Sequence, residues 1–99
     1  MKLQNEFEPI RNWAEKKGIF LKGDSKTQCI KLYEEAGELS KAILKNDEPE
    51  IIDAIGDCVV VLTNLAKLRG LKIEDCINSA YEVIEKRNGK MENGTFVKE

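Results

Sequence analysis

One segment, residues 48–69, limits the possible folds of this chain more than any other. Its apolar residues recur at intervals of three and four, which predicts a helix. They cover well over half of the helix circumference, and a helix of this kind is normally buried on most sides. The apolar positions are Ile51, Ile52, Ile55, Cys58, Val59, Leu62, Leu65 and Ala66. We therefore expect the rest of the chain to pack around this segment.

The same periodicity predicts three further helices, at residues 4–17, 25–45 and 73–87. The chain is accordingly all-α, with four helices in a single domain spanning residues 1–99. Three short helices cannot cover so apolar a fourth one, so we expect the chain to form an oligomer that completes the bundle core. Residues 88–99 form a tail in which Asn93-Gly94 predicts a turn; the tail either closes as a small hairpin or stays mobile.

Local signals predict where the helices begin and end. A capping box pairs the residue at the helix N-cap with the one three positions later, because each side chain accepts a hydrogen bond from the backbone of the other. Ser25 with Gln28 and Asp47 with Glu50 have this pattern. Residues 88–89, Asn followed by Gly, are predicted to cap the end of the last helix.

The composition excludes several classes of function. The chain contains no His, which rules out Ser/His/Asp triads, Cys/His nucleophiles, His-ligated zinc and the di-iron motif of ferritin-like bundles. Sixteen basic and 18 acidic residues give a net charge of −2, so we expect no nucleic acid partner. The longest uncharged apolar stretch, residues 58–66, is about half of the roughly 20 residues that a membrane span needs, so we expect no membrane partner.

The cysteines agree with a reducing compartment. Cys29, Cys58 and Cys76 are three in number and cannot all pair, and no apolar leader follows Met1. A cytoplasmic location is therefore expected. All three cysteines fall on apolar helix faces, where they are predicted to be small buried hydrophobic residues rather than metal ligands.

Charge is unevenly distributed along the chain. Residues 34–57 contain eight acidic and two basic side chains, whereas Lys86, Arg87 and Lys90 lie close together near the end. This arrangement suits a cation and a polyanion bound side by side. The alternative is that both clusters are ordinary solvated helix surfaces.

Four acidic residues lie where a helix normally has little contact with water. Glu35 and Glu38 border the apolar stripe of the helix at 25–45, and Asp53 and Asp57 lie one turn apart on the largely apolar helix at 48–69. Two like charges about 4 Å apart repel by about 4 kcal/mol at an effective dielectric constant near 20. Oxygen ligands on two neighbouring helices suit a hard cation such as Mg²⁺ or Mn²⁺. Alternatively, the acids form salt bridges with Lys31, Lys41 or Lys67, and Glu50 serves only the helix cap.

These residues also match a known sequence pattern. Glu34-Glu35-Ala36-Gly37-Glu38 is an EExxE motif, and DAIGDCVVVLTNLAKLRG follows at residues 53–70. From about residue 28 to 91 the chain resembles the MazG-like members of the all-α nucleoside triphosphate pyrophosphohydrolases, in which EExxE is followed by ExxD. The chain departs from that pattern at Ala54, where the second motif has its Glu. Asp53, or a literal ExxD formed by Glu50 and Asp53, would have to substitute.

The resemblance implies a function and a set of site residues. It implies Mg²⁺-dependent hydrolysis of nucleoside triphosphates, often deoxynucleotides, to the monophosphate and pyrophosphate, which clears unwanted nucleotides. Mn²⁺ is a substitute cofactor, and a homodimer or homotetramer is the expected assembly. On this reading the metal ligands are Glu35, Glu38, Asp53 and Asp57, Glu34 orients or deprotonates the water, Lys31, Lys86, Arg87 and Lys90 bind phosphate, and Trp13 and Asn64 contact the base.

Simpler readings of some of these residues stay open at this point. Glu34 is equally well explained as a surface residue and Trp13 as a core residue, and Lys86 and Arg87 also suit the negative end of a helix dipole. Two rival functions compete with the enzyme. One is a nucleotide sensor that binds triphosphate with little turnover, and the other is a non-catalytic helical module whose acidic stripe docks a basic partner.

Overall fold

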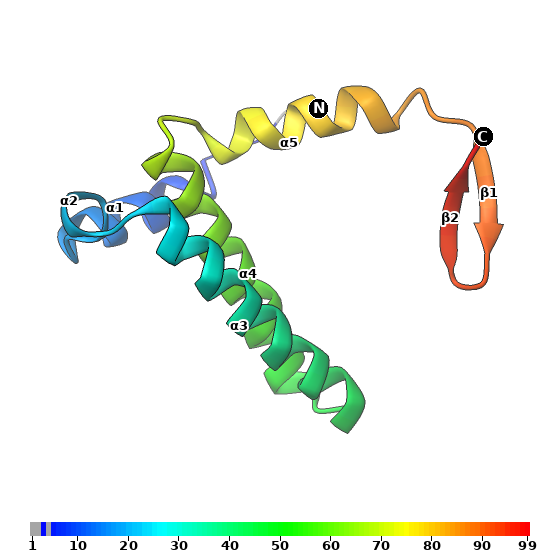
Figure 1. Cartoon of the computed structure of the whole chain (residues 1–99), viewed down its shortest axis with the longest axis horizontal. Coiled ribbons are helices and arrows are strands. Elements are labelled where there is room, and N and C mark those ends of the chain that lie inside the picture. Colours follow the sequence, from blue (N-terminus) through cyan, green and yellow to red (C-terminus); the bar gives the residue numbers. More distant parts are fainter. Residues whose placement is uncertain (1–2, 4) are drawn as a thin grey trace.

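The computed structural model of the chain describes residue 3 and residues 5–99. This part contains five helices followed by a two-stranded hairpin (Figure 1). No helix among the described residues has the length and the apolar character needed to cross a membrane. The predicted all-α class is confirmed. The elements are α1 (Glu8–Lys16), α2 (Ile19–Lys22), α3 (Ser25–Lys45), α4 (Glu48–Leu68), α5 (Ile73–Ile84), β1 (Gly89–Glu92) and β2 (Thr95–Lys98).

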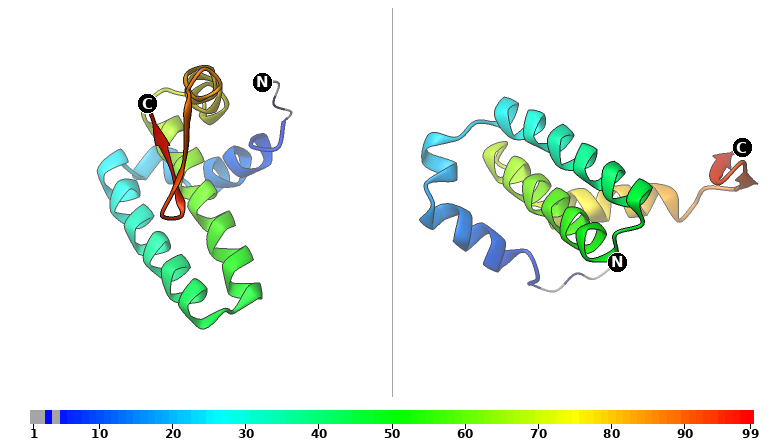
Figure 2. Two further views of the ribbon diagram at one scale, coloured as in Figure 1. Left: turned by 90° about the vertical axis from the view of Figure 1, so that its right-hand side faces the viewer. Right: turned by 90° about the horizontal axis from the view of Figure 1, so that it is seen from below.

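Helix α4 is the centre of the fold. Helices α1, α2, α3 and α5 all contact it, and α3 runs antiparallel beside it along most of its length (Figures 1 and 2). The most buried apolar side chains are small and come from three helices, with Ala14 on α1, Ala42 on α3, and Ala54, Val61 and Ala66 on α4. Small side chains at these positions let the helix backbones approach closely, so the core is a thin layer around α4.

One stripe of α4 stays uncovered in the single chain. Ile52 is 65% exposed and Ile55 is 51% exposed, and Val59 and Leu62 lie on the same uncovered side. Exposed apolar surface of this extent marks a contact surface in soluble proteins. The oligomer predicted from the sequence would cover this stripe, and it stays a prediction.

The predicted burial of the cysteines is wrong for the single chain. Cys29 and Cys76 are exposed and Cys58 is half-buried. The physical reason is the direction of α5, which extends away from the α3–α4 hairpin and leaves the apolar faces around Cys29 and Cys76 open (Figure 1). No two of the three cysteines are paired.

The N-terminal helix is shorter than predicted. Residue 4, the expected start, lies outside the described residues, and α1 begins at Glu8 after a turn at 5–7. Pro9 occupies the first turn of α1, where its fixed φ and missing N–H do no harm. Gly18 then reverses the chain with φ 77°, and α2 adds a single helical turn that was not predicted.

The predicted capping box of α3 is wrong, because the N-cap is Asp24 rather than Ser25. Asp24 has extended backbone angles, and its Oδ1 accepts a hydrogen bond from the backbone N of Thr27 at 2.8 Å. Its Oδ2 also accepts a bond from the Thr27 hydroxyl at 3.0 Å. These hydrogen bonds lower the pKa of Asp24, so the cap is charged at neutral pH.

Only one of the two hydrogen bonds of the predicted α4 capping box is present. Asp47 Oδ1 accepts a hydrogen bond from the backbone N of Glu50 at 3.3 Å. The backbone N of Asp47 donates instead to the Ala42 carbonyl at 3.0 Å, so it is not free to bond the Glu50 side chain. The Glu50 carboxylate therefore has no part in the cap.

The end of α5 differs from the prediction, and the strand pairing that follows it explains why residue 89 is a glycine. Helix α5 ends at Ile84 rather than 87, and Gly89 starts β1 opposite Lys98 instead of capping the helix. A Cβ atom on Gly89 would collide with the Val97 carbonyl and the Phe96 ring, so strand pairing requires glycine. At the hairpin tip, residues 93–94 both have positive φ, as in a type I′ turn. The predicted hairpin is confirmed.

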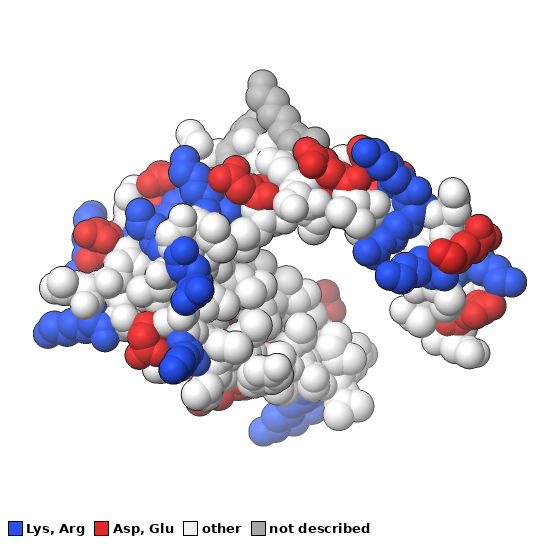
Figure 3. Space-filling model, turned by 45° about the horizontal axis from the view of Figure 1, so that its top comes forward, with Lys and Arg blue, Asp and Glu red and all other residues white. Residues whose placement is uncertain are grey.

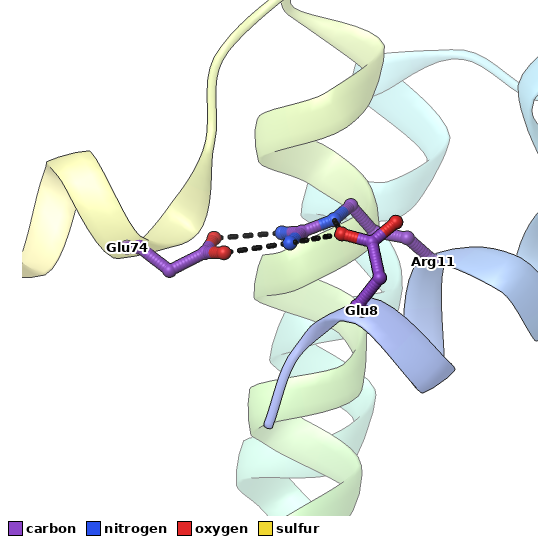
Figure 4. Close-up of polar contacts among 3 residues, drawn as sticks. All are labelled: Glu8, Arg11 and Glu74. Carbon is purple, nitrogen blue, oxygen red and sulfur yellow. Dashed lines mark hydrogen bonds and ion pairs between the residues drawn. The ribbon is translucent and has the colours of Figure 1, made fainter. Parts of the chain in front are cut away.

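An ion pair connects α5 to α1, 63 residues apart in the chain. Arg11, which is only 8% exposed, donates to both carboxylate oxygens of Glu74 at 2.7 and 2.6 Å (Figure 4). Its Nη2 also donates to Glu8 at 2.9 Å. The bond from Arg11 lowers the pKa of Glu74 to about 2. Apart from this pair, α5 packs only against α4 among the described helices, so the pair is a main determinant of its direction.

We predict that Glu74→Gln lowers the free energy of unfolding by about 2 kcal/mol at pH 7, since a bidentate bond to a charged partner is lost. The pKa of Glu74 in the folded chain lies below its ordinary value of 4.5. The contribution is therefore complete above about pH 4.5 and is lost as the pH falls toward about 2. Urea unfolding of wild type and variant between pH 7 and pH 3 measures it. Asp75→Asn, an exposed neighbour in the same turn, is the control, and equal losses in both variants would contradict the prediction.

Candidate active site

The four acids predicted as metal ligands lie along the α3–α4 hairpin, two on each helix. Glu35 and Glu38 are on α3, and Asp53 and Asp57 are on α4. The two helices pack against each other in antiparallel fashion (Figure 1), which brings the two pairs to one hairpin. The spacing of four residues between Asp53 and Asp57 keeps both on one side of α4.

Glu35 and Asp57 form the more buried half of the site. The Glu35 side chain is 13% exposed, and its Oε1 lies 3.5 Å from Lys31 Nζ. Its Oε2 is buried and has no hydrogen-bond partner among the described residues. A buried oxygen in that position costs about 1–3 kcal/mol. It is also the kind of donor that a hard divalent cation takes.

The electrostatics of Asp57 connect the acids across the two helices. Asp57 is half-buried, and burial is the main cause that raises its pKa. The negative charges of Asp53 and Glu35 raise it further, and only the Lys31 ammonium acts in the opposite direction. Three carboxylates and one ammonium group thus interact across the seam between α3 and α4.

Glu38 and Asp53 form the second, more open half. They line a pocket of about 340 Å³ between the two helices, together with Lys41, Lys45, Glu50 and Ala54. Ala54, at the position that departs from the ExxD pattern, is 5% exposed and forms part of the wall. Three carboxylates and two ammonium groups surround a space that a phosphate group with its cation can enter.

The lining of this pocket includes residues outside the predicted set of site residues. Glu50 was explained by the helix cap, with the literal ExxD as the alternative, and it lines the pocket with Glu38 and Asp53. The signal was present in the literal ExxD of Glu50 and Asp53. Lys41 and Lys45 are two further cations at this pocket that were not predicted as phosphate ligands.

The carboxylates lie near one another but do not form a complete metal-binding site. Among the described residues, no three acidic or cysteine side chains are close enough to hold a metal ion as they stand. The donor set nevertheless fits Mg²⁺ or Mn²⁺, since it is made of oxygen only and includes the unpartnered Glu35 Oε2. Metal binding requires the flexible Glu side chains to turn toward Asp53 and Asp57. The metal ligands therefore stay a prediction.

The predicted base-binding residues lie on the α1 side of Asp57. Trp13 is 49% exposed, so the alternative reading of Trp13 as a core residue is wrong. It lines a largely apolar pocket of about 400 Å³ whose remaining walls are Pro9, Ile10, Asp57 and Val60. An accessible indole next to a candidate metal ligand is suitably placed to stack on a base.

Asn64 lies deeper than Trp13, four residues beyond Val60 on α4. It is 2% exposed, and its Oδ1 has no hydrogen-bond partner among the described residues. Its neighbour Thr63 shows the usual solution for a buried polar group, since its hydroxyl donates to the Val59 carbonyl at 2.7 Å. The base contact predicted for Asn64 would use an oxygen that the fold leaves without a partner, and it stays a prediction.

The remaining predicted residues fall into two groups. Glu34 is exposed on α3 directly before Glu35, and Lys31 is paired with Glu35. Lys86 and Arg87 follow the end of α5, and Lys90 is in β1. Basic side chains gather, with acidic ones beside them, toward one end of the molecule (Figure 3). Within one chain, the structure does not bring Lys86, Arg87 and Lys90 together with the acids.

Comparison with known proteins identifies the family. Residues 24–91 match the family model of the MazG nucleotide pyrophosphohydrolase domain. The chain belongs to this family. The matched part of this MazG chain contains α3, α4, α5 and most of β1, and therefore all the predicted metal and phosphate ligands. The resemblance predicted from EExxE and its context is confirmed, and Trp13 lies outside the match.

A relative of this MazG chain is a phage protein. Over 65 residues the chain is 43% identical to an uncharacterized 18.2 kDa protein in the rep-hol intergenic region of Haemophilus phage HP1 (strain HP1c1). The match covers 66% of the chain and 40% of the phage protein, so the chain spans less than half of that relative. No solved structure matches the chain.

We predict that Asp57→Asn raises the melting temperature of the metal-free protein at pH 7, because it removes a charge that is disfavoured by burial and by Asp53 and Glu35. A gain of about 1 kcal/mol corresponds to about 4–8 °C in a domain of this size. Thermal melts in chelator measure it. Glu34→Gln, which removes an exposed charge from the same motif, should change the melting temperature little. Destabilisation by Asp57→Asn would contradict a site that is strained without metal.

Proposed function

We propose that this MazG domain hydrolyses nucleoside triphosphates, with deoxynucleoside triphosphates as the expected substrates, to the monophosphate and pyrophosphate. The role expected in the cell is the removal of unwanted nucleotides. The observation that carries the proposal is the seam of carboxylates between α3 and α4, inside the matched domain, with one buried oxygen left without a partner. The lack of His does not weaken it, since phosphoryl transfer needs positioning and charge neutralisation rather than a covalent nucleophile.

The four acids would hold Mg²⁺, or Mn²⁺ in its place. Such a cation would offset the negative charge that the triphosphate brings into the site. Glu34 is exposed beside Glu35 and is the residue proposed to orient the attacking water and take its proton. The water oxygen bonds to the α-phosphorus while the bond to the bridging oxygen breaks. Pyrophosphate leaves with that oxygen, and the nucleoside monophosphate remains.

Other side chains would position the substrate. Lys31 lies 3.5 Å from Glu35 and is the predicted phosphate ligand nearest the buried acids. Lys41 and Lys45 line the pocket with Glu38 and add two cations for the outer phosphates. Trp13, in the pocket that Asp57 also lines, is proposed to stack on the base. The base would then lie toward α1 and the phosphates toward the α3–α4 loop.

A second candidate function follows from Ala54. The methyl group of Ala54 faces the pocket at the position where the ExxD pattern has a carboxylate. A site with one ligand fewer suits a sensor that binds nucleoside triphosphate and turns it over slowly. Measured turnover separates this candidate from the enzyme, because both predict metal-dependent binding.

We predict that the protein with Mg²⁺ releases pyrophosphate and monophosphate from at least one member of a panel of ribo- and deoxynucleoside triphosphates. Excess EDTA should abolish the reaction, because the oxygen-only site has no other source of positive charge of that strength. Chromatography of the nucleotide product, together with separate assays for pyrophosphate and phosphate, measures it. Nucleoside diphosphate and orthophosphate as products, or full activity in chelator, would refute the proposed reaction.

We further predict that Glu38→Gln and Asp57→Asn each lower kcat/KM by at least about a hundredfold, the scale of losing a key electrostatic group. Glu50→Gln separates the two alignments of the second motif. If Asp53 and Asp57 are the ligands, this variant has near wild-type activity, whereas a hundredfold loss would identify Glu50 as a ligand. Glu82→Gln, which removes an exposed charge on α5, is the control. Retention of full activity by Asp57→Asn would exclude this site.

A further inference from the structure

The ion pair between Lys31 and Glu35 joins two partners that differ in mobility. Lys31 Nζ lies 3.5 Å from Glu35 Oε1, and the two residues are one turn apart on α3. This distance is longer than that of the charge-assisted hydrogen bonds that fix a lysine to a carboxylate. The Glu35 side chain is 13% exposed, whereas the Lys31 side chain is 50% exposed. The carboxylate is therefore held by its surroundings, while the ammonium group can move on its flexible stem.

Lys31 offsets only part of the negative charge in the buried half of the candidate site. The charges of Asp53 and Glu35 disfavour the ionised form of Asp57, and Lys31 is the cation that acts in the opposite direction. Three carboxylates against one ammonium group leave two negative charges uncompensated. In addition, Glu35 Oε2 is buried and has no hydrogen-bond partner among the described residues. The metal-free site therefore keeps Lys31 at Glu35 by charge alone.

A divalent cation held by these acids would take over the part that Lys31 has in the metal-free chain. Its two positive charges equal the two that are missing. The ammonium group and the cation would then lie beside the same carboxylate and repel each other. Lys31 is the partner that can leave Glu35, because half of its side chain is already exposed and no hydrogen bond holds it.

The phosphates of a bound nucleotide give Lys31 its next partner. A nucleoside triphosphate brings more negative charge than one divalent cation offsets. Lys31 is one turn from Glu35 on α3, so its ammonium group can reach a ligand at the acids by rotation of the side chain alone. An ammonium group is a point charge with three donors and no fixed plane, which suits it to bind first a carboxylate and then a phosphate.

We propose that Lys31 exchanges partners: its ammonium group pairs with Glu35 in the metal-free chain and moves to the phosphates when a divalent cation and a nucleoside triphosphate bind. The inference rests on the proposed function for the identity of the ligand. It assigns to one side chain two contacts that exclude each other. Removal of the ammonium group should therefore have opposite effects on the binding of the metal and on the binding of the nucleotide.

Lys31→Met tests these opposite effects, because it keeps a long apolar side chain and removes the charge. Its affinity for Mn²⁺ alone, measured by electron paramagnetic resonance, should rise about three- to tenfold, since a like charge beside the cation is lost. Its affinity for α,β-methylene analogues of the four common deoxynucleoside triphosphates with Mg²⁺, measured by calorimetry, should fall at least about tenfold. An unchanged or lower Mn²⁺ affinity would overturn the proposal, and so would an unchanged affinity for the analogues.

Two further variants separate the exchange from general effects of charge. Lys31→Arg keeps the charge and should keep both affinities within about threefold of the wild-type values. Lys26→Met removes an exposed cation from the first turn of the same helix. It should change both affinities by less than about twofold, because exposed charges at that distance are screened. Changes in Lys26→Met as large as those in Lys31→Met would show that the overall charge of α3 is responsible, and would overturn the proposal.

Lysine acetylation tests the exchange in the wild-type chain. A low dose of an acetyl succinimidyl ester labels accessible amines, and mass spectrometry measures the labelling of each lysine. Mg²⁺ alone should raise the labelling of Lys31, because the amine released from Glu35 is more accessible. Mg²⁺ with a bound analogue should lower it below the metal-free level, with Lys26 in the same samples as the reference. Equal labelling of Lys31 in all three states would overturn the exchange.

These measurements separate the exchange from the proposed function. If triphosphates are hydrolysed while Lys31→Met leaves the Mn²⁺ affinity unchanged, the exchange is refuted and the enzyme stands. If Mg²⁺ alone releases Lys31 while no analogue binds and no triphosphate is hydrolysed, the proposed function is refuted. The transfer of Lys31 to phosphate is then refuted with it, and only its release from Glu35 by the metal stands.

Discussion

The apolar circumference of α4 is the constraint on which the rest of the structure depends. All the other helices of the described chain pack on this one, and each covers part of it. The positions left between the neighbours are where Asp53 and Asp57 emerge, at the border between core and water. Burial and mutual repulsion then raise the pKa of Asp57. The same packing that builds the fold thus prepares a strained acidic seam, and such strain is a common cost of a binding site.

A charged pair, rather than a packed apolar interface, sets the direction of α5. Arg11 and Glu74 are largely buried at their contact and make two short hydrogen bonds, a geometry that fixes orientation as well as distance. An apolar helix face normally turns toward the nearest apolar surface. Here the ion pair holds α5 so that Val83 and Ile84 stay uncovered. The exposed apolar face of α5 therefore follows from one arginine on α1.

Much of this fold could be predicted because its signals are local. Apolar periodicity over about 20 residues identified α3 and α4 closely, and Asn93-Gly94 identified the hairpin turn. Helix α2 was missed because a single turn is too short to show a period. Asp24 and Ser25 are adjacent and both cap helices well, so only the extended backbone at Asp24 decides between them.

Features that depend on distant contacts could not be read from the sequence. The exposure of Cys29 and Cys76 depends on where α5 points, and no local pattern encodes that direction. Arg11 was nevertheless a usable signal, because an arginine among the apolar positions of a helix requires a buried acidic partner. For the site, the motif located the acids on α3 and α4, but the shared pocket of Glu38 and Glu50 needed the register between the two helices.

That register also bears on the carboxylate missing at Ala54. Glu50, Ala54 and Asp57 follow one another at intervals of four and three residues, so they share one face of α4. Glu50 is one turn from Ala54 and has a longer side chain than aspartate, while the small Ala54 leaves space in the wall of the pocket. Since the Glu50 carboxylate takes no part in the cap, it is free to point into that space. If Glu50 serves as a ligand, the acid of the second motif lies one helix turn before Ala54; this assignment, like that of Asp53 with Asp57, stays a prediction.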